Sequence, residues 1–179
     1  QVTSDLLENN KKVVVTKPWV LNCREADMVL ETMGKTSGMV IPWLPRHWSR
    51  QIKDLKSLVE SGRIGKVFHI QHSEFTFGKR GDWQVWKQYG GGYLNNWGPH
   101  VIGAALDVAG GRVRRVCADM KQIINSGDTE DMFHAMMKTQ SGILINAEYT
   151  VSTDRLPNWV LRGDKGTVYA TGNEIEVHE

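Results

Sequence analysis

Apolar residues near the start of the chain form two short runs separated by a helical pattern. Residues 13–15 and 38–41 are apolar runs of strand length. Between them, Asn22 precedes Glu25 by three residues in a capping-box pattern, and Gly34 stands where a C-terminal helix cap is expected. The pattern predicts a strand, a helix and a second strand in one αβ-type unit.

A second helical pattern covers residues 49–61 and ends at Gly62. The period then changes to two, and a strand beginning at Val67 would place four residues on one face: Phe68, Ile70, His72 and Glu74. Residues 143–151 alternate in the same way. Because turn signals separate the later runs, we predict antiparallel neighbours. The predicted fold class is α+β, with an open, mostly antiparallel β-sheet, about five strands after residue 112, and helices packed on one face.

The composition is that of an ordinary globular protein. Its 22 basic and 20 acidic residues are interspersed and leave a net charge of +2, so we expect no nucleic-acid partner. No apolar run approaches the roughly 20 residues of a membrane span, so we expect no membrane partner. Cys23 and Cys117 lie far apart and outside metal-type spacing. We expect two buried thiols without a disulfide.

Lys17 and Pro18 directly follow the first apolar run. In an open α/β sheet the ligand crevice lies at the carboxyl ends of strands, where an ammonium group can polarise a hydroxyl or carbonyl group. Pro18 can hold such a loop rigidly. The alternative is a surface lysine before a turn proline, and the dipeptide by itself is more typical of that alternative.

The stretch GGGYLNNWGPH at residues 90–100 is a second candidate for chemistry. If a helix begins near Asn95 or Asn96, Pro99 falls in its first turn, and Asn96 and His100 face the same way. Histidine is suited to proton transfer near neutral pH. The alternative is that one asparagine caps the helix and His100 is a hydrogen-bonded core residue.

Other polar and aromatic residues form weaker patterns. His69 and His72 are three apart on a strand and point to opposite faces, so they cannot bind one metal ion, and we expect no metal site. A polar cluster before a later strand suits a solvated turn: Asp128, Glu130, Asp131 and His134. Flat rings beside the glycines suit a sugar face or the core: Trp83, Trp86 and Trp97.

Five segments, in fixed order, resemble the Gfo/Idh/MocA oxidoreductases: VVVTKP, PRHWSRQIKDLKSLVESGRIGKV, GGGYLNNWGPHVIGAALDVAGG, GDTED and GDKGTV. That family uses NAD or NADP and often acts on sugars, inositols and related polyols. Its members join a dinucleotide-binding domain to a C-terminal domain whose open sheet often mediates oligomerisation. The resemblance implies that residues 1–44 are the end of a Rossmann domain and that residues 45–179 form a substrate and oligomerisation domain.

The resemblance also implies roles for individual residues. Lys17 would contact the nicotinamide and polarise the substrate hydroxyl, and Pro18 would shape the loop beneath the cofactor. His100 would be the general base, and Asn96 would occupy the position of the family's catalytic aspartate. The residues implied to bind substrate are Trp83, Asn95, Asn96 and His100.

This sequence departs from the family pattern at three of these positions. Thr16 replaces the acid before Lys17, Asn96 replaces the catalytic aspartate, and Gly103 replaces an aspartate three residues after the histidine. An amide can hold a hydroxyl group but cannot stabilise an imidazolium as a carboxylate does. The G-x-G-x-x-G fingerprint is absent from this sequence, so we expect NAD or NADP in the full-length parent and little or none bound by this chain alone.

We therefore expect part of an NAD(P)-dependent oxidoreductase that acts on a sugar or polyol. The alternatives are an NAD-dependent glycosidase of the same family and a non-catalytic sugar-binding or dimerisation module. We expect a homo-oligomer that forms through the C-terminal sheet. We also expect a cytoplasmic protein, with export left open because the resemblance implies further residues before Gln1.

Overall fold

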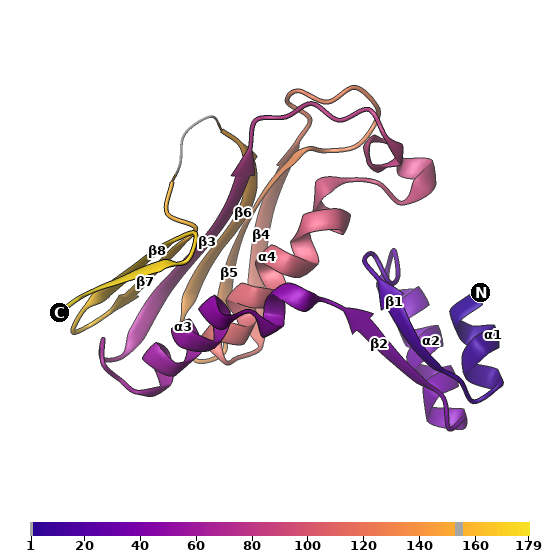
Figure 1. Cartoon of the computed structure of the whole chain (residues 1–179), viewed down its shortest axis with the longest axis horizontal. Coiled ribbons are helices and arrows are strands. Elements are labelled where there is room, and N and C mark those ends of the chain that lie inside the picture. The colour runs from indigo at the N-terminus through magenta and orange to yellow at the C-terminus, as the bar shows by residue number, and fades with distance from the viewer. Residues whose placement is uncertain (1, 153–155) are drawn as a thin grey trace. The chain divides into compact units, whose positions relative to one another are not determined.

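The computed structural model describes residues 2–152 and 156–179. The chain divides into two compact units, residues 1–45 and residues 46–179, which Figure 1 colours from indigo to yellow along the sequence.

The first unit is built from two helices and a pair of strands: α1 (Val2–Glu8), β1 (Lys12–Thr16), α2 (Cys23–Lys35) and β2 (Met39–Trp43). β1 and β2 pair in parallel, as expected when a helix connects them. The predicted capping box is confirmed, because the Glu25 N–H donates to Asn22 Oδ1 at 3.0 Å. The predicted end at Gly34 is wrong by one residue: α2 continues to Lys35, and the Thr36 N–H caps it by donating to the Met33 carbonyl.

The second unit contains short helical turns, two longer helices and a sheet. The helical segments are η1 (Pro45–Trp48), α3 (Arg50–Glu60), η2 (Trp83–Val85), η3 (Lys87–Tyr89) and α4 (Tyr93–Ala109). The strands are β3 (Val67–Thr76), β4 (Val113–Lys121), β5 (Met132–Thr139), β6 (Leu144–Val151), β7 (Trp159–Gly163), β8 (Thr167–Thr171) and β9 (Glu174–His178).

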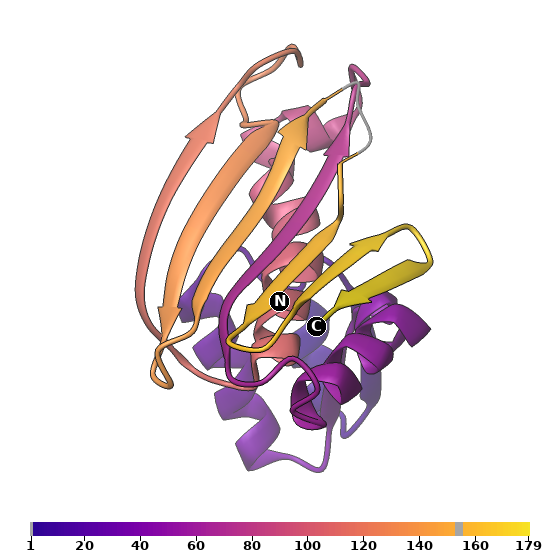
Figure 2. The same cartoon turned by 90° about the vertical axis from the view of Figure 1, so that its left-hand side faces the viewer.

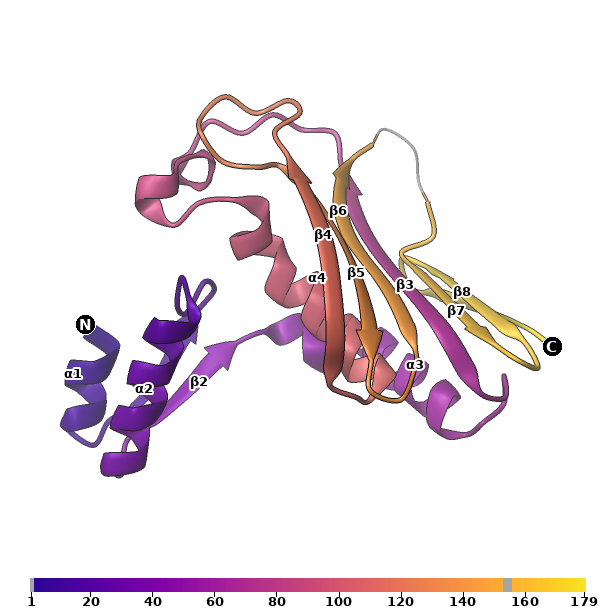
Figure 3. The same cartoon turned by 180° about the vertical axis from the view of Figure 1, so that it is seen from behind.

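Among the described residues, seven strands form one sheet in the order β4-β5-β6-β3-β7-β8-β9. Six of them follow residue 112, where the turn signals predicted about five. Every neighbouring pair is antiparallel except β3 and β6, which are parallel. The prediction of a mostly antiparallel open sheet is confirmed. Figure 2 looks onto the sheet with α4 behind it, and Figure 3 shows the molecule from behind Figure 1.

The core lies between the sheet and α4. Val101, Ala104 and Val108 of α4 are almost fully buried in one cluster with Ile70 of β3 and Ile145 of β6. Full burial of an aliphatic side chain such as Ile145 contributes roughly 1.5–3 kcal/mol relative to exposure. The α4 helix is therefore held against the middle of the sheet, and the residues along its other faces are placed with it.

The prediction that Phe68 shares a face of β3 with Ile70 and His72 is wrong. Ile70 and His72 are buried, whereas Phe68 is exposed. The register of β3 with β7 shifts between Val67 and His69, so the regular alternation of the strand is interrupted at Phe68.

The two cysteines are free thiols, but the expectation that they are buried is wrong. Cys23 and Cys117 are both exposed. Cys23 is the first residue of α2, and Cys117 lies on β4, the strand at the edge of the sheet. An edge strand has a neighbour on one side only, so its side chains are covered less than those of β5 or β6.

Candidate functional site

The start of α4 is fixed by a distant carboxylate. The helix begins at Tyr93, earlier than the predicted start near Asn95 or Asn96, and its N-cap is Gly92 with a φ of 105°. The Tyr93 N–H donates to the Glu130 carbonyl at 3.1 Å, and the Leu94 N–H donates to Glu130 Oε1 at 3.0 Å. L side chains rarely adopt this positive φ, so glycine is needed there, and a Cβ on residue 92 would also lie 2.5 Å from Glu130 Oε1.

Neither asparagine acts as the expected N-cap. Asn95 Nδ2 donates to the carbonyl of Gly91 at 3.0 Å and so ties the glycine stretch to the helix. Asn96 is buried, and its Nδ2 donates to Gln84 Oε1. Pro99 lies inside α4, not in its first turn, because the helix begins at Tyr93.

His100 lies in the wall of a cleft of about 390 Å³ in the second unit. We call it the His100 cleft. Its lining includes Arg46, His72, Glu74 and Asn158, so it is rich in polar side chains. His100 itself is only 8% exposed. Its ring lies edge-on to Trp97, with the centroids 6.2 Å apart. A buried imidazole in a polar cleft of this volume can face a small hydroxylated molecule.

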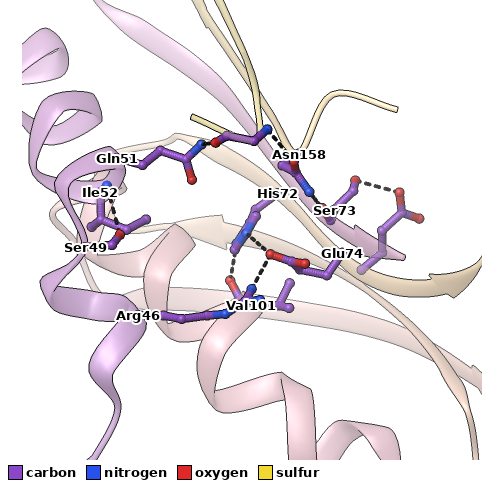
Figure 4. A network of polar contacts seen from close by, with 11 residues as sticks. Arg46, Ser49, Gln51, Ile52, His72, Ser73, Glu74, Val101 and Asn158 are labelled. Carbon is purple, nitrogen blue, oxygen red and sulfur yellow. Dashed lines mark hydrogen bonds and ion pairs between the residues drawn. The ribbon is translucent and has the colours of Figure 1, made fainter. Parts of the chain in front are cut away.

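A network of polar contacts joins β3 to η1 and α4 in this cleft (Figure 4). His72 Nδ1 lies 2.9 Å from the Val101 carbonyl oxygen, which can only accept, so Nδ1 carries a proton. His72 stacks on Trp159 with ring centroids 3.7 Å apart, and its Nε2 lies 3.8 Å from Glu74 Oε1. The contacts with Val101, Trp159 and Glu74 together hold the His72 imidazole in one orientation.

Glu74 and Arg46 form the charged part of the network. The Arg46 guanidinium donates to Glu74 Oε1 and also lies over the Trp97 ring, 5.0 Å from its centroid. Burial by itself raises the pKa of Glu74, but the interactions with His72 and Arg46 outweigh it, so the pKa of this carboxyl is lowered. Glu74 is therefore ionised at neutral pH.

The sequence reasoning missed Arg46 and gave His72 and Glu74 little weight. The signal for the latter two was present, since β3 was predicted to place both on one face. Arg46 had no comparable signal, because its importance comes from the contact of η1 with residues of β3 and α4 that are distant in sequence.

Lys17 and Pro18 lie in the first unit, directly after the carboxyl end of β1. The Lys17 side chain is half-buried, and the peptide bond to Pro18 is cis. β1 pairs in parallel with β2, so Lys17 and Pro18 follow the carboxyl end of a paired strand, as predicted.

The remaining candidates have different surroundings. Trp83, which was predicted to bind substrate, is 46% exposed on η2. Trp97 stacks on Tyr149 with centroids 4.9 Å apart and packs against the core. His69 contacts Asn146 and Arg162, whereas His72 contacts Val101 and Trp159, which agrees with the prediction that the two histidines face opposite ways. Over residues 2–152 and 156–179, no group of three His, Cys, Asp or Glu side chains could hold a metal ion. No helix in the same ranges is long and apolar enough to span a bilayer.

The polar cluster before β5 is a structural support, and the prediction of a solvated turn fits the exposed Asp128 but is wrong for Asp131. Asp131 is fully buried, and its carboxylate accepts backbone N–H groups of Ile123, Ile124 and Asn125 at 2.6–2.9 Å. Asp128 accepts from the Lys87 N–H at 2.8 Å. Together with Glu130 at α4, these carboxylates satisfy backbone donors that would otherwise lack partners.

Comparison with known proteins agrees with this fold. Residues 52–169 match the model of the GFO/IDH/MocA C-terminal domain. The chain is 24% identical over 161 residues to 1-carboxy-3-chloro-3,4-dihydroxycyclohexa-1,5-diene dehydrogenase of Comamonas testosteroni, covering 86% of this chain and 41% of that protein. It is 26% identical over 113 residues to an uncharacterized oxidoreductase of Schizosaccharomyces pombe, covering 62% of this chain and 31% of the relative.

Among solved structures, an NAD-binding protein from Listeria innocua matches with a TM-score of 0.92 at 23% identity, over 98% of this chain and 51% of that one. This likeness shows the fold. The chain spans about half or less of the length of each of these relatives. Because the family model covers well over half of the chain, this chain belongs to the Gfo/Idh/MocA family.

Proposed function

We propose that this chain is part of an NAD(P)-dependent oxidoreductase that oxidises a hydroxyl group of a sugar or polyol. The observation that carries the proposal is the position of His100 in a polar cleft large enough for such a molecule. The names of two similar proteins support it, since one is a dehydrogenase of a dihydroxylated ring and the other binds NAD.

Two residues of the chain carry the proposed chemistry. In the first unit, the proposed role of the Lys17 ammonium is to polarise a substrate hydroxyl group. In the second unit, the proposed role of the His100 imidazole is to accept a proton. NAD, when bound, supplies the acceptor for the hydride. The first unit fits a nicotinamide site, because Lys17 and Pro18 follow the carboxyl end of a strand in a parallel pair, where ligands bind in open α/β sheets.

The test is NADH formation by the full-length protein with a panel of polyols. Lys17→Ala and His100→Ala are each expected to lower kcat by roughly 10²–10⁴-fold, the usual contribution of a general acid or base. Lys12→Ala, at an exposed lysine of β1, is the matched control and should retain activity. Turnover that is unchanged in both site variants would contradict the assigned roles.

A non-catalytic module is the second candidate, and Asn96 favours it. The family position that carries a carboxylate holds an amide here, and that amide is already bound to Gln84. This candidate predicts that His100→Ala retains sugar binding while no polyol yields NADH. The glycosidase alternative predicts a third outcome, release of nitrophenol from an aryl glycoside without net NADH formation.

We also propose that the protein is a homo-oligomer that associates through the sheet. α4 packs on one face, and the opposite face, seen in Figure 2, includes the exposed Met136 of β5. Met136→Glu should shift the mass measured by light scattering toward the monomer. Met28→Glu, at an exposed methionine of α2, is the control. A wild-type protein that is monomeric at high concentration would contradict this proposal.

A further inference from the structure

A second cleft in the same unit lies beyond Glu74, where β3 ends and α4 begins. It has a volume of about 420 Å³, and its walls include Lys79, Arg80, Tyr93, Trp97 and Tyr149. We call it the Arg80 cleft. Glu74 lines both this cleft and the His100 cleft, so the two clefts meet at one residue.

Arg80 presents a donor that lacks an acceptor in the part of the chain that the structure describes. Its Nη2 pairs with Asp82, whereas its Nε–H is buried and has no hydrogen-bond partner among the described residues. Buried N–H groups in proteins are nearly always hydrogen-bonded, and an unmatched one costs about 1–3 kcal/mol. The Arg80 Nε–H would therefore be stabilised by an acceptor beyond those that the described residues provide.

Two phenols add to the donors at this place. Tyr93 and Tyr149 both line the cleft, with their rings edge to face and 4.8 Å apart at the centroids. Burial raises the pKa of the Tyr149 hydroxyl, and the neighbouring Tyr93 raises it further. This phenol therefore stays protonated at neutral pH and can donate a hydrogen bond. Trp97, which stacks on Tyr149, supplies an apolar wall.

The charges of the cleft favour a single negative charge in the ligand. Glu74 is the one acidic residue among the described residues of the lining, and it is paired with Arg46. Asp82 neutralises Arg80 in the same way. Lys79, which is exposed and in no ion pair within the described ranges, leaves one positive charge. One net positive charge matches a carboxylate better than a phosphate dianion.

We propose that the Arg80 cleft binds the carboxylate of the substrate, so that the substrate is a hydroxylated carboxylic acid and not a neutral polyol. Arg80, Tyr149 and Lys79 are then residues that determine specificity. The inference rests on the proposed oxidoreductase function for its meaning, but the binding itself needs neither the cofactor nor turnover.

The binding test follows the side-chain Nε–H signal of Arg80 by NMR in this chain. The probes are cyclohexanecarboxylate, cyclohexanemethanol as its neutral counterpart, and inorganic phosphate. We expect a saturable shift with the carboxylate, and little or none with the alcohol or with phosphate. Equal responses to the acid and the alcohol, or no response to the acid, would overturn the proposal. A stronger response to phosphate would overturn the choice of a carboxylate.

Variants separate a binding role from a structural one. Tyr149→Phe keeps the ring packing and removes one donor, and Arg80→Lys keeps the charge and removes the Nε–H. Each should weaken binding of the carboxylate roughly 10–100-fold, as for a lost hydrogen bond to a charged group. Arg63→Gln breaks the exposed ion pair with Glu179 and should leave the affinity unchanged. Equal affinity in all four proteins, with the wild type included, would refute the assignment.

Kinetics of the full-length protein distinguish this inference from the proposed function. If NADH forms with polyols but an acid and its neutral counterpart have equal kcat/KM, the oxidoreductase stands and the carboxylate site fails. If the acid binds through Arg80 and no substrate yields NADH, the carboxylate site stands and the oxidoreductase fails. If the wild type prefers the acid in kcat/KM, and Arg80→Lys loses this preference but retains kcat, both the oxidoreductase and the carboxylate site are supported.

Discussion

His47 packs directly onto Gly103, in the space that a side chain at position 103 would occupy. The His47 Nε2 lies 3.0 Å from the carbonyl oxygen of Pro99, and its Nδ1 lies 2.6 Å from Asp107 Oδ2. A Cβ on residue 103 would lie 2.6 Å from His47 Cε1. The glycine that departs from the family pattern thus allows η1 to bind along α4.

Gly103→Ala is expected to destabilise the protein, although alanine is the better helix former. The clash with the His47 ring should cost about 1–3 kcal/mol, more than the gain of about 1 kcal/mol in helix propensity. Gly34→Ala in α2 is the control, because a Cβ there meets nothing within 4 Å and should be neutral or stabilising. Chemical denaturation measures both. A stabilised Gly103→Ala would show that His47 moves aside at little cost.

Glu130→Ala should loosen the first turn of α4. The substitution removes the carboxylate that accepts the Leu94 N–H, which should cost about 0.5–2 kcal/mol, as for a lost helix cap. Hydrogen exchange at the Leu94 amide reports this change locally. Glu60→Ala, at an exposed glutamate ending α3, should leave that amide unaffected. Unaltered exchange at Leu94 in Glu130→Ala would contradict the capping role.

His69 should make stability depend on pH in the weakly acidic range. Burial lowers the pKa of His69, and the charge of Arg162 lowers it further. Arg162 donates to His69 Nδ1 at 2.6 Å, a bond that requires the neutral ring. With a folded pKa below the unfolded value of 6.5, the contribution is complete above pH 6.5 and is lost as the pH falls through the folded pKa.

Denaturation of wild type and His69→Gln across this pH range measures the effect. The wild type should lose more stability than His69→Gln as the pH falls below about 6.5. His178→Gln, at an exposed histidine near Glu176, should follow the wild-type slope. Parallel curves for wild type and His69→Gln would rule out this linkage.

Asn96→Asp tests whether the amide limits the proposed chemistry. A carboxylate one helical turn before His100 would stabilise an imidazolium, and each pKa unit of such an effect corresponds to about 1.4 kcal/mol. We expect kcat of the full-length protein to rise about ten-fold. Asn9→Asp, at an exposed asparagine after α1, is the matched control and should leave kcat unchanged. A lower kcat in Asn96→Asp alone would indicate that the Gln84 contact matters more than the charge.

Local pattern alone was enough to predict several elements. The capping box at Asn22, the α3 helix and the alternation of β6 depend on neighbours within a few residues, and all three are present in the structure. The family and its open sheet could also be predicted, because the order of five motifs is a property of the sequence. The register shift near Phe68 could not, since it arises from the pairing of β3 with β7.

The sites depended on the tertiary structure. His100 stood out in the sequence because its residue type and spacing carry a chemical meaning. Its neighbours Arg46 and Glu74 come from segments 28 residues apart and become partners only when η1 lies beside β3. Glu130 looked like part of a solvated turn until the fold placed it at the start of α4. Sequence therefore determined which side chains are able to react or bind, and the packing of distant segments decided which of them share a cleft.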